Sequence, residues 1–295
     1  MVVVLILDPL LAFSDLLCIL YQVCQADMVS FKIFQKNISL VLDTQESLAV
    51  AQDESGGYWV VTYKEGPGNG FYSYHIDGTT GLLNTVPVIS GDGGERRGNF
   101  ISSIKFNPCS DQLTRIELDA SRTGVEGIEL WAFDNTIGTV IESPKVLYID
   151  NARPYGVEYS PNGVYVYINN LYSREIFRCE AKSDNPQSSL EKVGEAIGNQ
   201  VGAMQLGPDG KIYISSETTF NNASLGVILD PNNPLVASVD FNPKGVLITG
   251  DYVRPYLGLP SFVSSFSGSS VRFTHTDLCT EEIGFSYNYT GTAVS

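Results

Sequence analysis

Histidine and positive charge are both scarce in this sequence. Its 295 residues include 2 histidines, and 33 Asp and Glu residues outnumber 18 Lys and Arg residues, for a formal net charge of −15. Because such a chain repels a phosphate backbone, nucleic acid is disfavoured as a partner. A Ser-His-Asp triad or a histidine-based metal site would have to use His75 or His275. His75 lies in the strand-like run "FYSYHID", where we expect a solvent-facing side chain, and we predict no catalytic role for either histidine.

Closely spaced cysteines are absent as well. The 5 cysteines include no Cys-x-x-Cys pair, which disfavours a zinc site. Their odd number excludes an intrachain set in which every cysteine is paired, and we expect buried free thiols. The positions are Cys18, Cys24, Cys109, Cys179 and Cys279.

Long uninterrupted apolar runs are also missing. No run reaches membrane-spanning length, so we predict no transmembrane span. Residues 1–26 are apolar, but they lack a basic start, and Asp8, Pro9 and Asp15 interrupt them. A signal peptide has a basic start and a clean apolar centre, so this segment is predicted to be a poor signal peptide or an irregular N-terminal segment.

Turn-forming and aromatic residues are plentiful. The chain contains 28 Gly and 16 Tyr residues, and 43% of it is hydrophobic, whereas long Ala/Glu/Lys/Leu-rich helical runs are missing. This mixture favours many short strands joined by turns. The length allows a sizeable core in one large or two small domains.

A turn signature recurs along the chain. Three stretches each place a Pro-containing turn between two arms of alternating polarity, and their prolines lie 53 and 47 residues apart. Proline presets φ at the first central position of a turn, and Asn-Gly or Asp-Gly tolerates the positive φ that follows, so each stretch predicts a β-hairpin. The stretches are "SIKFNPCSDQLTRIELD" (Ser103–Asp119), "GVEYSPNGVYVYINN" (Gly156–Asn170) and "AMQLGPDGKIYISSE" (Ala203–Glu217).

Two further stretches that are similar to these hairpins, and a set of single strand-like runs, extend the repeat. A relative without proline covers Ser47–Tyr63, and a weaker one covers Ser238–Tyr252. Strand-like runs follow the hairpins, so that each unit offers three or four strands. The period and the β signal predict an all-β chain, a YVTN/WD40-like β-propeller with about five blade-like units. A β-sandwich is the structural alternative. The runs are "GFYSYHID" (Gly70–Asp77), "GIELWAFD" (Gly127–Asp134), "REIFRCEA" (Arg174–Ala181) and "LGVILDP" (Leu225–Pro231).

The propeller is expected to be incomplete. A blade cannot bury both of its faces alone, so neighbouring blades must stack. Met28–Val41 is predicted to form the outer strands of a blade whose inner strands are missing, which makes this an incomplete seven-bladed ring. An open edge leaves strand groups unpaired, so edge-mediated self-association is expected.

An ordered set of motifs resembles a known family. The motifs are "YWVVTYKEGPGNGFYSYHID", "RPYGVEYSPNGVYVYINN", "GAMQLGPDGKIYISS", "LGVILDPNNP" and "YLGLPSFVSSF". They resemble the propeller region of large secreted proteins of Bacteroidota, which are associated with gliding motility or are cargo of the type IX secretion system. In that family the propeller precedes immunoglobulin-like PKD domains and a sorting domain. The resemblance covers roughly residues 27–266 and implies a secreted or cell-surface location, outside the outer membrane, with no established catalytic residues.

The chain departs from this family at both ends. The N-terminal blades are replaced by residues 1–26, and the sorting domain is absent. The tail at 271–295 resembles the opening strands of a PKD-like domain. We therefore expect three regions in a fragment of a longer protein: the segment 1–26, a propeller at 27–266, and a linker with the truncated start of a PKD or immunoglobulin-like domain at 267–295.

Several residue groups could carry chemistry, but each has a structural explanation. Lactonase-type propellers hold a divalent cation near the axis with carboxylate and Asn side chains, and four residues lie near hairpin arms where they could converge. We interpret them instead as exposed strand residues or turn formers. The four are Asp119, Glu158, Asn170 and Glu217.

Other groups lie in loops or on strands. The Gly91–Asn99 loop lacks the Gly-Lys-Ser/Thr of a phosphate-binding loop, and its Arg96 and Arg97 could hold an anionic glycan or simply face solvent. We expect Arg153 to pair with an acid of a neighbouring blade, and Tyr155 to pack between blades. Trp59 and Trp131 are predicted to pack in the core or between blades. The glycosylation sequons are Asn37, Asn222 and Asn288.

Together these patterns predict a non-catalytic propeller scaffold that binds a protein or glycan ligand at a bacterial cell surface. No catalytic, cofactor-binding or metal residue is predicted, and no cofactor is expected. The alternatives are a metal-dependent, lactonase-like hydrolase and an inert structural spacer.

Overall fold

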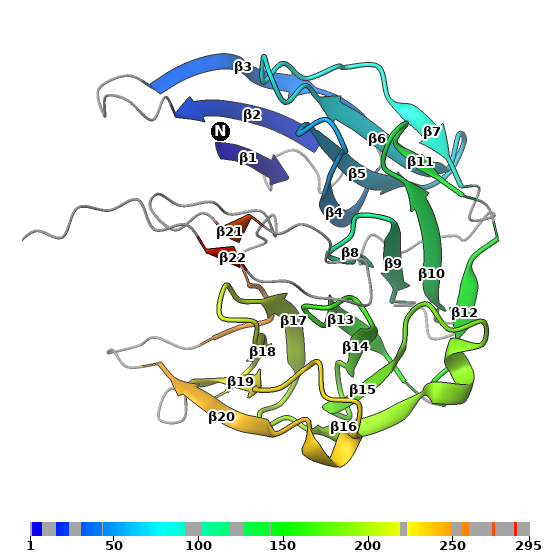
Figure 1. The fold of residues 1–295 in the computed structure, drawn as a ribbon, viewed down its shortest axis with the longest axis vertical. Helices are drawn as coiled ribbons and strands as arrows, with labels where there is room; N and C mark the ends of the chain where they lie inside the picture. Colours follow the sequence, from blue (N-terminus) through cyan, green and yellow to red (C-terminus); the bar gives the residue numbers. More distant parts are fainter. Residues whose placement is uncertain are drawn as a thin grey trace, which may run out of the picture. The chain divides into compact units, whose positions relative to one another are not determined.

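The computed structural model is built almost entirely of antiparallel β-strands (Figure 1). It describes residues 2–7, 16–23, 31–42, 44–91, 102–118, 127–141, 143–150, 152–218, 223–248, 255–259, 273–274 and 286–287. Among these described residues, the short 3-10 helices η1 (Pro186–Ser189) and η3 (Val236–Ser238) each precede the outer strand of a sheet. The prediction of an all-β chain is confirmed.

Four sheets have the up-and-down strand order of propeller blades (Figure 1). The first contains β4 (Thr44–Gln52), β5 (Tyr58–Lys64), β6 (Gly70–Ile76) and β7 (Val88–Ser90). The second contains β8 (Ser102–Phe106), β9 (Gln112–Glu117), β10 (Gly127–Asp134), β11 (Thr139–Val140) and β12 (Lys145–Leu147). The third contains β13 (Pro154–Tyr159), β14 (Tyr165–Asn170), β15 (Glu175–Glu180) and β16 (Glu191–Glu195). The fourth contains β17 (Val201–Leu206), β18 (Ile212–Ser216), β19 (Ser224–Ile228) and β20 (Phe241–Leu247).

The chain divides into two compact units. Blades β4–β7 and β8–β12 belong to the first unit, blade β17–β20 belongs to the second, and β13–β16 contains residues of both. The first unit comprises Met1–Phe106, Ser110–Val157 and Asn169–Ser173, and the second comprises Asn107–Cys109, Glu158–Ile168 and Arg174–Ser295.

The hairpins form where the turn signature predicts them. Between β13 and β14, Ser160 N–H donates to Tyr165 O at 2.8 Å, and Gly163 has a φ of 69°. Gly210 takes the same position between β17 and β18, with a φ of 76°. Glycine is needed at these two points because side chains disfavour positive φ. The other two predicted hairpins are β4–β5 and β8–β9, and the four single strands appear as β6, β10, β15 and β19.

The prediction of a hairpin in the fifth repeat unit is wrong. Residues Phe241–Leu247 form one strand, β20, which pairs with β19 as the outermost strand of its blade. Pro243 is tolerated there because an outermost strand does not need every backbone N–H in the ladder. The described residues therefore contain four blades, and the seven-bladed ring stays a prediction.

The N-terminal region contains regular strands. Strands β1 (Val2–Leu7) and β2 (Leu16–Val23) form a three-stranded sheet with β3 (Phe31–Ser39). The expectation of a poor signal peptide or an irregular segment at residues 1–26 stays a prediction. Near the C-terminus, β21 (Phe273–Thr274) pairs with β22 (Ser286–Tyr287). The domain boundaries at 26/27 and 266/267 stay predictions.

Aromatic side chains join the two blades of the first unit. Trp59, Phe71 and Val61 of blade β4–β7 share one buried cluster with Leu113 and Trp131 of blade β8–β12. The Phe71 ring meets the Trp131 ring edge-on, with centroids 5.4 Å apart. The predicted packing of both tryptophans is confirmed, because Trp59 is 7% and Trp131 is 2% exposed.

The cysteines are not all alike. Cys179 is the expected buried free thiol, and burial raises its pKa to about 12. The expectation is wrong for Cys109, which is disulfide-bonded. The side chains of Cys18, Cys24 and Cys279 lie outside the described residues. Within the part of the chain that the structure describes, no helix is long and apolar enough to cross a membrane.

The turn between β10 and β11 allows a test of blade packing. Gly138 has a φ of 71°, and a Cβ added there would lie 2.5 Å from the Trp59 indole. Gly138→Ala should lower the free energy of unfolding by about 3 kcal/mol, since it adds overpacking to the left-handed backbone cost. Gly56 is the matched control, because it has a φ of 86° and nothing within 4 Å of an added Cβ. Gly56→Ala should cost only about 1 kcal/mol.

Urea unfolding followed by tryptophan fluorescence measures both losses. Equal losses in the two variants would contradict the packing of Trp59 against this turn.

Candidate functional site

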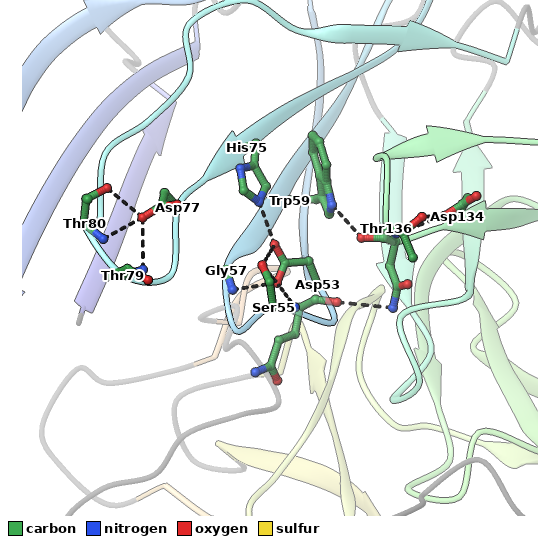
Figure 2. A network of polar contacts seen from close by, with 12 residues as sticks. Asp53, Ser55, Gly57, Trp59, His75, Asp77, Thr79, Thr80, Asp134 and Thr136 are labelled. Carbon is green, nitrogen blue, oxygen red and sulfur yellow. Dashed lines mark hydrogen bonds and ion pairs between the residues drawn. The ribbon is translucent and has the colours of Figure 1, made fainter.

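Three turns in the first unit share the pattern Asp-x-Ser/Thr-x-Gly. In each turn, the aspartate Oδ1 accepts the backbone N–H of the residue two positions later (Figure 2). Such local bonds fix the turn without help from the rest of the sheet. The pairs are Asp53–Ser55 at 2.8 Å, Asp77–Thr79 at 3.0 Å and Asp134–Thr136 at 2.9 Å.

Asp53 differs from the other two aspartates because its carboxylate also reaches another strand. It lies in the turn between β4 and β5 and is 9% exposed. Its Oδ2 is 2.6 Å from Nε2 of His75 in β6, and its Oδ1 accepts the Gly57 N–H at 2.6 Å (Figure 2). Asp53 therefore ties the inner hairpin of this blade to its third strand.

The site contains an acid, a histidine and a serine, but their order differs from that of a catalytic triad. Ser55 Oγ donates to both carboxylate oxygens of Asp53, at 2.9 and 3.0 Å. A triad would instead place the serine hydroxyl on the histidine, which would act as its base. The geometry is that of an aspartate held by several donors, which stabilises the turn.

His75 is half-buried, so the expectation that it faces solvent is wrong. Its imidazole contacts Asp53 and lies at a tilt against Trp59, with ring centroids 4.6 Å apart. Trp59 Nε1 in turn donates to Asn135 O in the β10–β11 turn at 2.8 Å (Figure 2). This chain of contacts connects the Asp53 turn of one blade with the Asp134 turn of the next blade in the same unit.

The contacts of Asp53 favour its charged form. Burial alone would raise the pKa of this carboxyl group, but hydrogen bonds from His75, Ser55 and Gly57 outweigh burial and lower the pKa from 3.8. Accepted hydrogen bonds stabilise a carboxylate more than its neutral acid.

A second polar cluster of the first unit is buried around Arg115. Its Nη1 donates to Glu129 Oε2 at 3.1 Å, and its Nη2 donates to Glu117 Oε2 at 2.9 Å. The same Nη2 also donates to Gln45 Oε1 at 3.0 Å, which links β9 to β4 of the other blade. The guanidinium carbon lies 3.8 Å from the centroid of the Tyr63 ring. Buried charges are tolerated when they are paired in this way, so Arg115 is a structural link between two blades.

The proposed ligands of a lactonase-type cation have other contacts. Glu158 is 4% exposed, and its two oxygens accept the backbone N–H groups of Tyr159 and Leu206, each at 2.9 Å. Asn170 is also buried, and Glu217 is half-buried. The interpretation as an exposed strand residue is therefore wrong for Glu158, which is buried in β13. The structure thus places Glu158 as a link between β13 and β17 of the second unit. Among the described residues, no group of three or more His, Cys, Asp or Glu side chains has the spacing of a metal site.

Some predicted candidates cannot be placed. The side chains concerned lie outside the described residues: His275, Asp119, Arg96, Arg97, Asn37, Asn222 and Asn288.

Half-buried Arg153 and exposed Tyr172 form a pair in the first unit. The guanidinium carbon of Arg153 lies 5.6 Å from the centroid of the Tyr172 ring, and Tyr172 is 48% exposed. Asn170 Oδ1 accepts the backbone N–H groups of both residues, at 3.2 and 3.3 Å. Leu171 N–H donates to Arg153 O at 2.8 Å. The loops at the start of β13 and the end of β14 are therefore joined, and they hold a cation and an aromatic ring together at the surface.

The second unit contains an open, mainly apolar cavity at the hairpin between β17 and β18. Its volume is about 710 Å³. Tyr213 lies in its wall and donates its hydroxyl to Asp209 Oδ2 at 2.9 Å. The lining residues are Gln205, Gly207, Pro208, Asp209, Tyr213, Leu225 and Leu259.

Comparison with solved structures identifies the fold. Over 75% of this chain and 65% of the other, the structure matches the periplasmic gluconolactonase of Pseudomonas aeruginosa, with a TM-score of 0.51 at 16% identity. The fold is that of a β-propeller. A putative 6-phosphogluconolactonase of Bacteroides uniformis matches over 79% of this chain and 65% of its own, with a TM-score of 0.48 at 16% identity. The chain thus spans about two thirds of these structures. No known family model and no curated protein matches the sequence.

Sequence reasoning missed the central residue of the Asp53 network. The signal was present, because Asp-x-Ser/Thr-x-Gly begins at Asp53, Asp77 and Asp134. This pattern differs from the proline-containing turn signature, since none of these three turns contains proline. The partner His75 could not be assigned in this way, because it lies 22 residues away on another strand.

The lowered pKa of Asp53 predicts a specific pH dependence. Its folded pKa lies below 3.8, so its stabilisation is complete above that value and is lost as the pH falls through the folded pKa. Asp53→Asn should lower the free energy of unfolding by about 2 kcal/mol at pH 7, and the difference from wild type should shrink below about pH 4. Urea unfolding at pH 7, 5, 4 and 3 measures this difference.

Glu54→Gln is the control for charge, because it removes the same charge from the exposed neighbouring residue. It should show no such dependence. A loss for Asp53→Asn that stays constant down to pH 3 would contradict the role given to the carboxylate.

Proposed function

We propose that this chain is a non-catalytic β-propeller scaffold that binds a glycan or protein ligand through exposed loop residues. The feature that supports this proposal best is the pair of Arg153 and Tyr172. Tyrosine and arginine dominate the energy of many binding surfaces, because both offer large contact areas together with hydrogen-bonding groups. As part of the same proposal, the chain belongs to a secreted or cell-surface protein of Bacteroidota, as the motif resemblance implies.

The rigidity of the pair supports a binding role. Asn170 fixes the backbone of both loops, so little conformational freedom is lost when a ligand binds. The exposed ring of Tyr172 offers an apolar face to a sugar ring or an apolar side chain. The guanidinium of Arg153 lies 5.6 Å from the centroid of this ring and places a positive charge beside it, which suits an acidic group of a ligand.

A metal-dependent propeller hydrolase is the second candidate. The fold shared with the gluconolactonase favours it at the level of architecture only. The contacts of Glu158 weigh against it, because both carboxylate oxygens accept backbone N–H groups within the blades. A cation ligand would direct at least one of these oxygens toward the metal.

A glycan array probed with the whole chain tests the proposal. Wild type should bind a subset of glycans, and Tyr172→Ala should weaken that binding at least tenfold through loss of the stacking surface. Tyr256→Ala is the matched control, since Tyr256 is 57% exposed and lies in the other unit. It should leave binding unchanged.

Two outcomes would overturn the proposal. Stoichiometric binding of Ca²⁺ together with hydrolysis of gluconolactone would identify a hydrolase. Absence of binding to glycans and to surface proteins would identify an inert spacer.

A further inference from the structure

In the second unit, one blade packs on the next through alternate side chains. Tyr165, Tyr167 and Ile176 of blade β13–β16 form a buried cluster with Ile212 and Ile214 of blade β17–β20. We call the side of blade β13–β16 that carries these first three residues its forward face. The side of blade β17–β20 that packs against them is the rear face of that blade, and the same two terms apply to every blade. Tyr167 is fully buried in this contact, and burial raises its pKa to about 12.

Blade β17–β20 has a forward face of its own. Residues alternate across a strand, so Tyr213, which lies between Ile212 and Ile214, points to the side opposite the rear face. In the sheet, Tyr213 is flanked by Gln205 of β17 and Val227 of β19. Leu225, two residues before Val227, points to the same side. Tyr213, Gln205 and Leu225 line the apolar cavity, so the cavity lies on the forward face.

The wall of this cavity is fixed by a segment that follows the blade. Leu257 O accepts the Ala203 N–H at 2.6 Å and the Ser215 hydroxyl at 2.8 Å. Gly202 leaves room for this contact, because an added Cβ would lie 2.1 Å from Leu257 O. Leu259, two residues further on, completes the lining. The forward face is therefore a preformed surface with a hollow at its hairpin end.

Asp209 of the cavity lining pairs with a base of the same hairpin. Lys211 Nζ lies 2.9 Å from Asp209 Oδ2, and both residues belong to the hairpin between β17 and β18. A surface that carries an acid next to a base can pair with a second copy of itself when a twofold axis passes between the two residues. In that arrangement, the acid of one copy faces the base of the other.

We propose that the forward face of blade β17–β20 binds a second copy of this chain, face to face, about a twofold axis. Inside the second unit, the forward face of blade β13–β16 is buried against the apolar rear face of the next blade, whereas in the dimer the forward face of the second copy covers the forward face of blade β17–β20. The apolar lining supplies the attraction, and the pair of Asp209 and Lys211 sets the register. Two chains of net charge −15 repel each other, so salt should strengthen the dimer.

Sedimentation equilibrium of the whole chain tests the dimer. Wild type should shift from monomer to dimer with rising protein concentration. Its dissociation constant should decrease when the NaCl concentration is raised from 20 mM to 500 mM. Leu225→Gln should raise that constant at least tenfold. Leu235→Gln is the control, since it makes the same change at a residue that is 67% exposed and outside the cavity lining. It should leave the constant unchanged.

Charge reversal separates a lost contact from a damaged fold. Asp209→Lys alone and Lys211→Glu alone should each dimerise poorly, because like charges then face each other across the twofold axis. An equal mixture of the two variants should form a heterodimer as tightly as wild type, because each acid again meets a base.

Three results would overturn the proposal. The first is a wild-type chain that stays monomeric at high salt. The second is an equal effect of Leu225→Gln and Leu235→Gln. The third is a mixture of the charge variants that associates no better than either variant alone. Glycan binding at Tyr172 is independent of all three outcomes.

Discussion

The structure depends on one constraint: a β-sheet that is apolar on both faces must be covered on both faces. In the first unit, Trp59 and Phe71 meet Leu113 and Trp131 of the next blade. In the second unit, alternate residues of β14 and β18 fulfil the same requirement. Because a blade cannot satisfy this requirement alone, the turns and polar links serve to hold each sheet at the correct distance and register for its neighbour.

The polar networks of the first unit follow from this constraint. Asp53 fixes a hairpin to the third strand through His75, and His75 lies against Trp59, whose indole reaches the neighbouring turn. The buried Arg115 donates hydrogen bonds to two glutamates of its own blade and to a glutamine of the other blade, and it thereby joins the two blades. These charged groups resemble parts of active sites when they are considered one at a time. Their hydrogen bonds show that they connect strands and turns.

The fold was largely predictable from the sequence, and the side-chain sites were not. The turn at Pro161 follows local rules, so its position and the alternation of Tyr165 and Tyr167 could be derived from neighbouring residues. The same local rules wrongly predict a hairpin turn at Pro243, because proline is also tolerated in an outermost strand such as β20. The roles of Glu158 and His75 depend on partners 48 and 22 residues away, which no local pattern specifies.

The sequence by itself determined the strands, the hairpins and the repeat, because turn chemistry and alternation act over a few residues. Only the tertiary structure decided which polar residues are used internally and which stay at the surface. Asn170 illustrates the difference: as a residue type it suits a cation site, yet its side chain holds the loops that carry Arg153 and Tyr172. The physical reason is that a carboxylate or amide oxygen binds whichever donor the fold brings within 3 Å or so, and that donor is set by long-range packing.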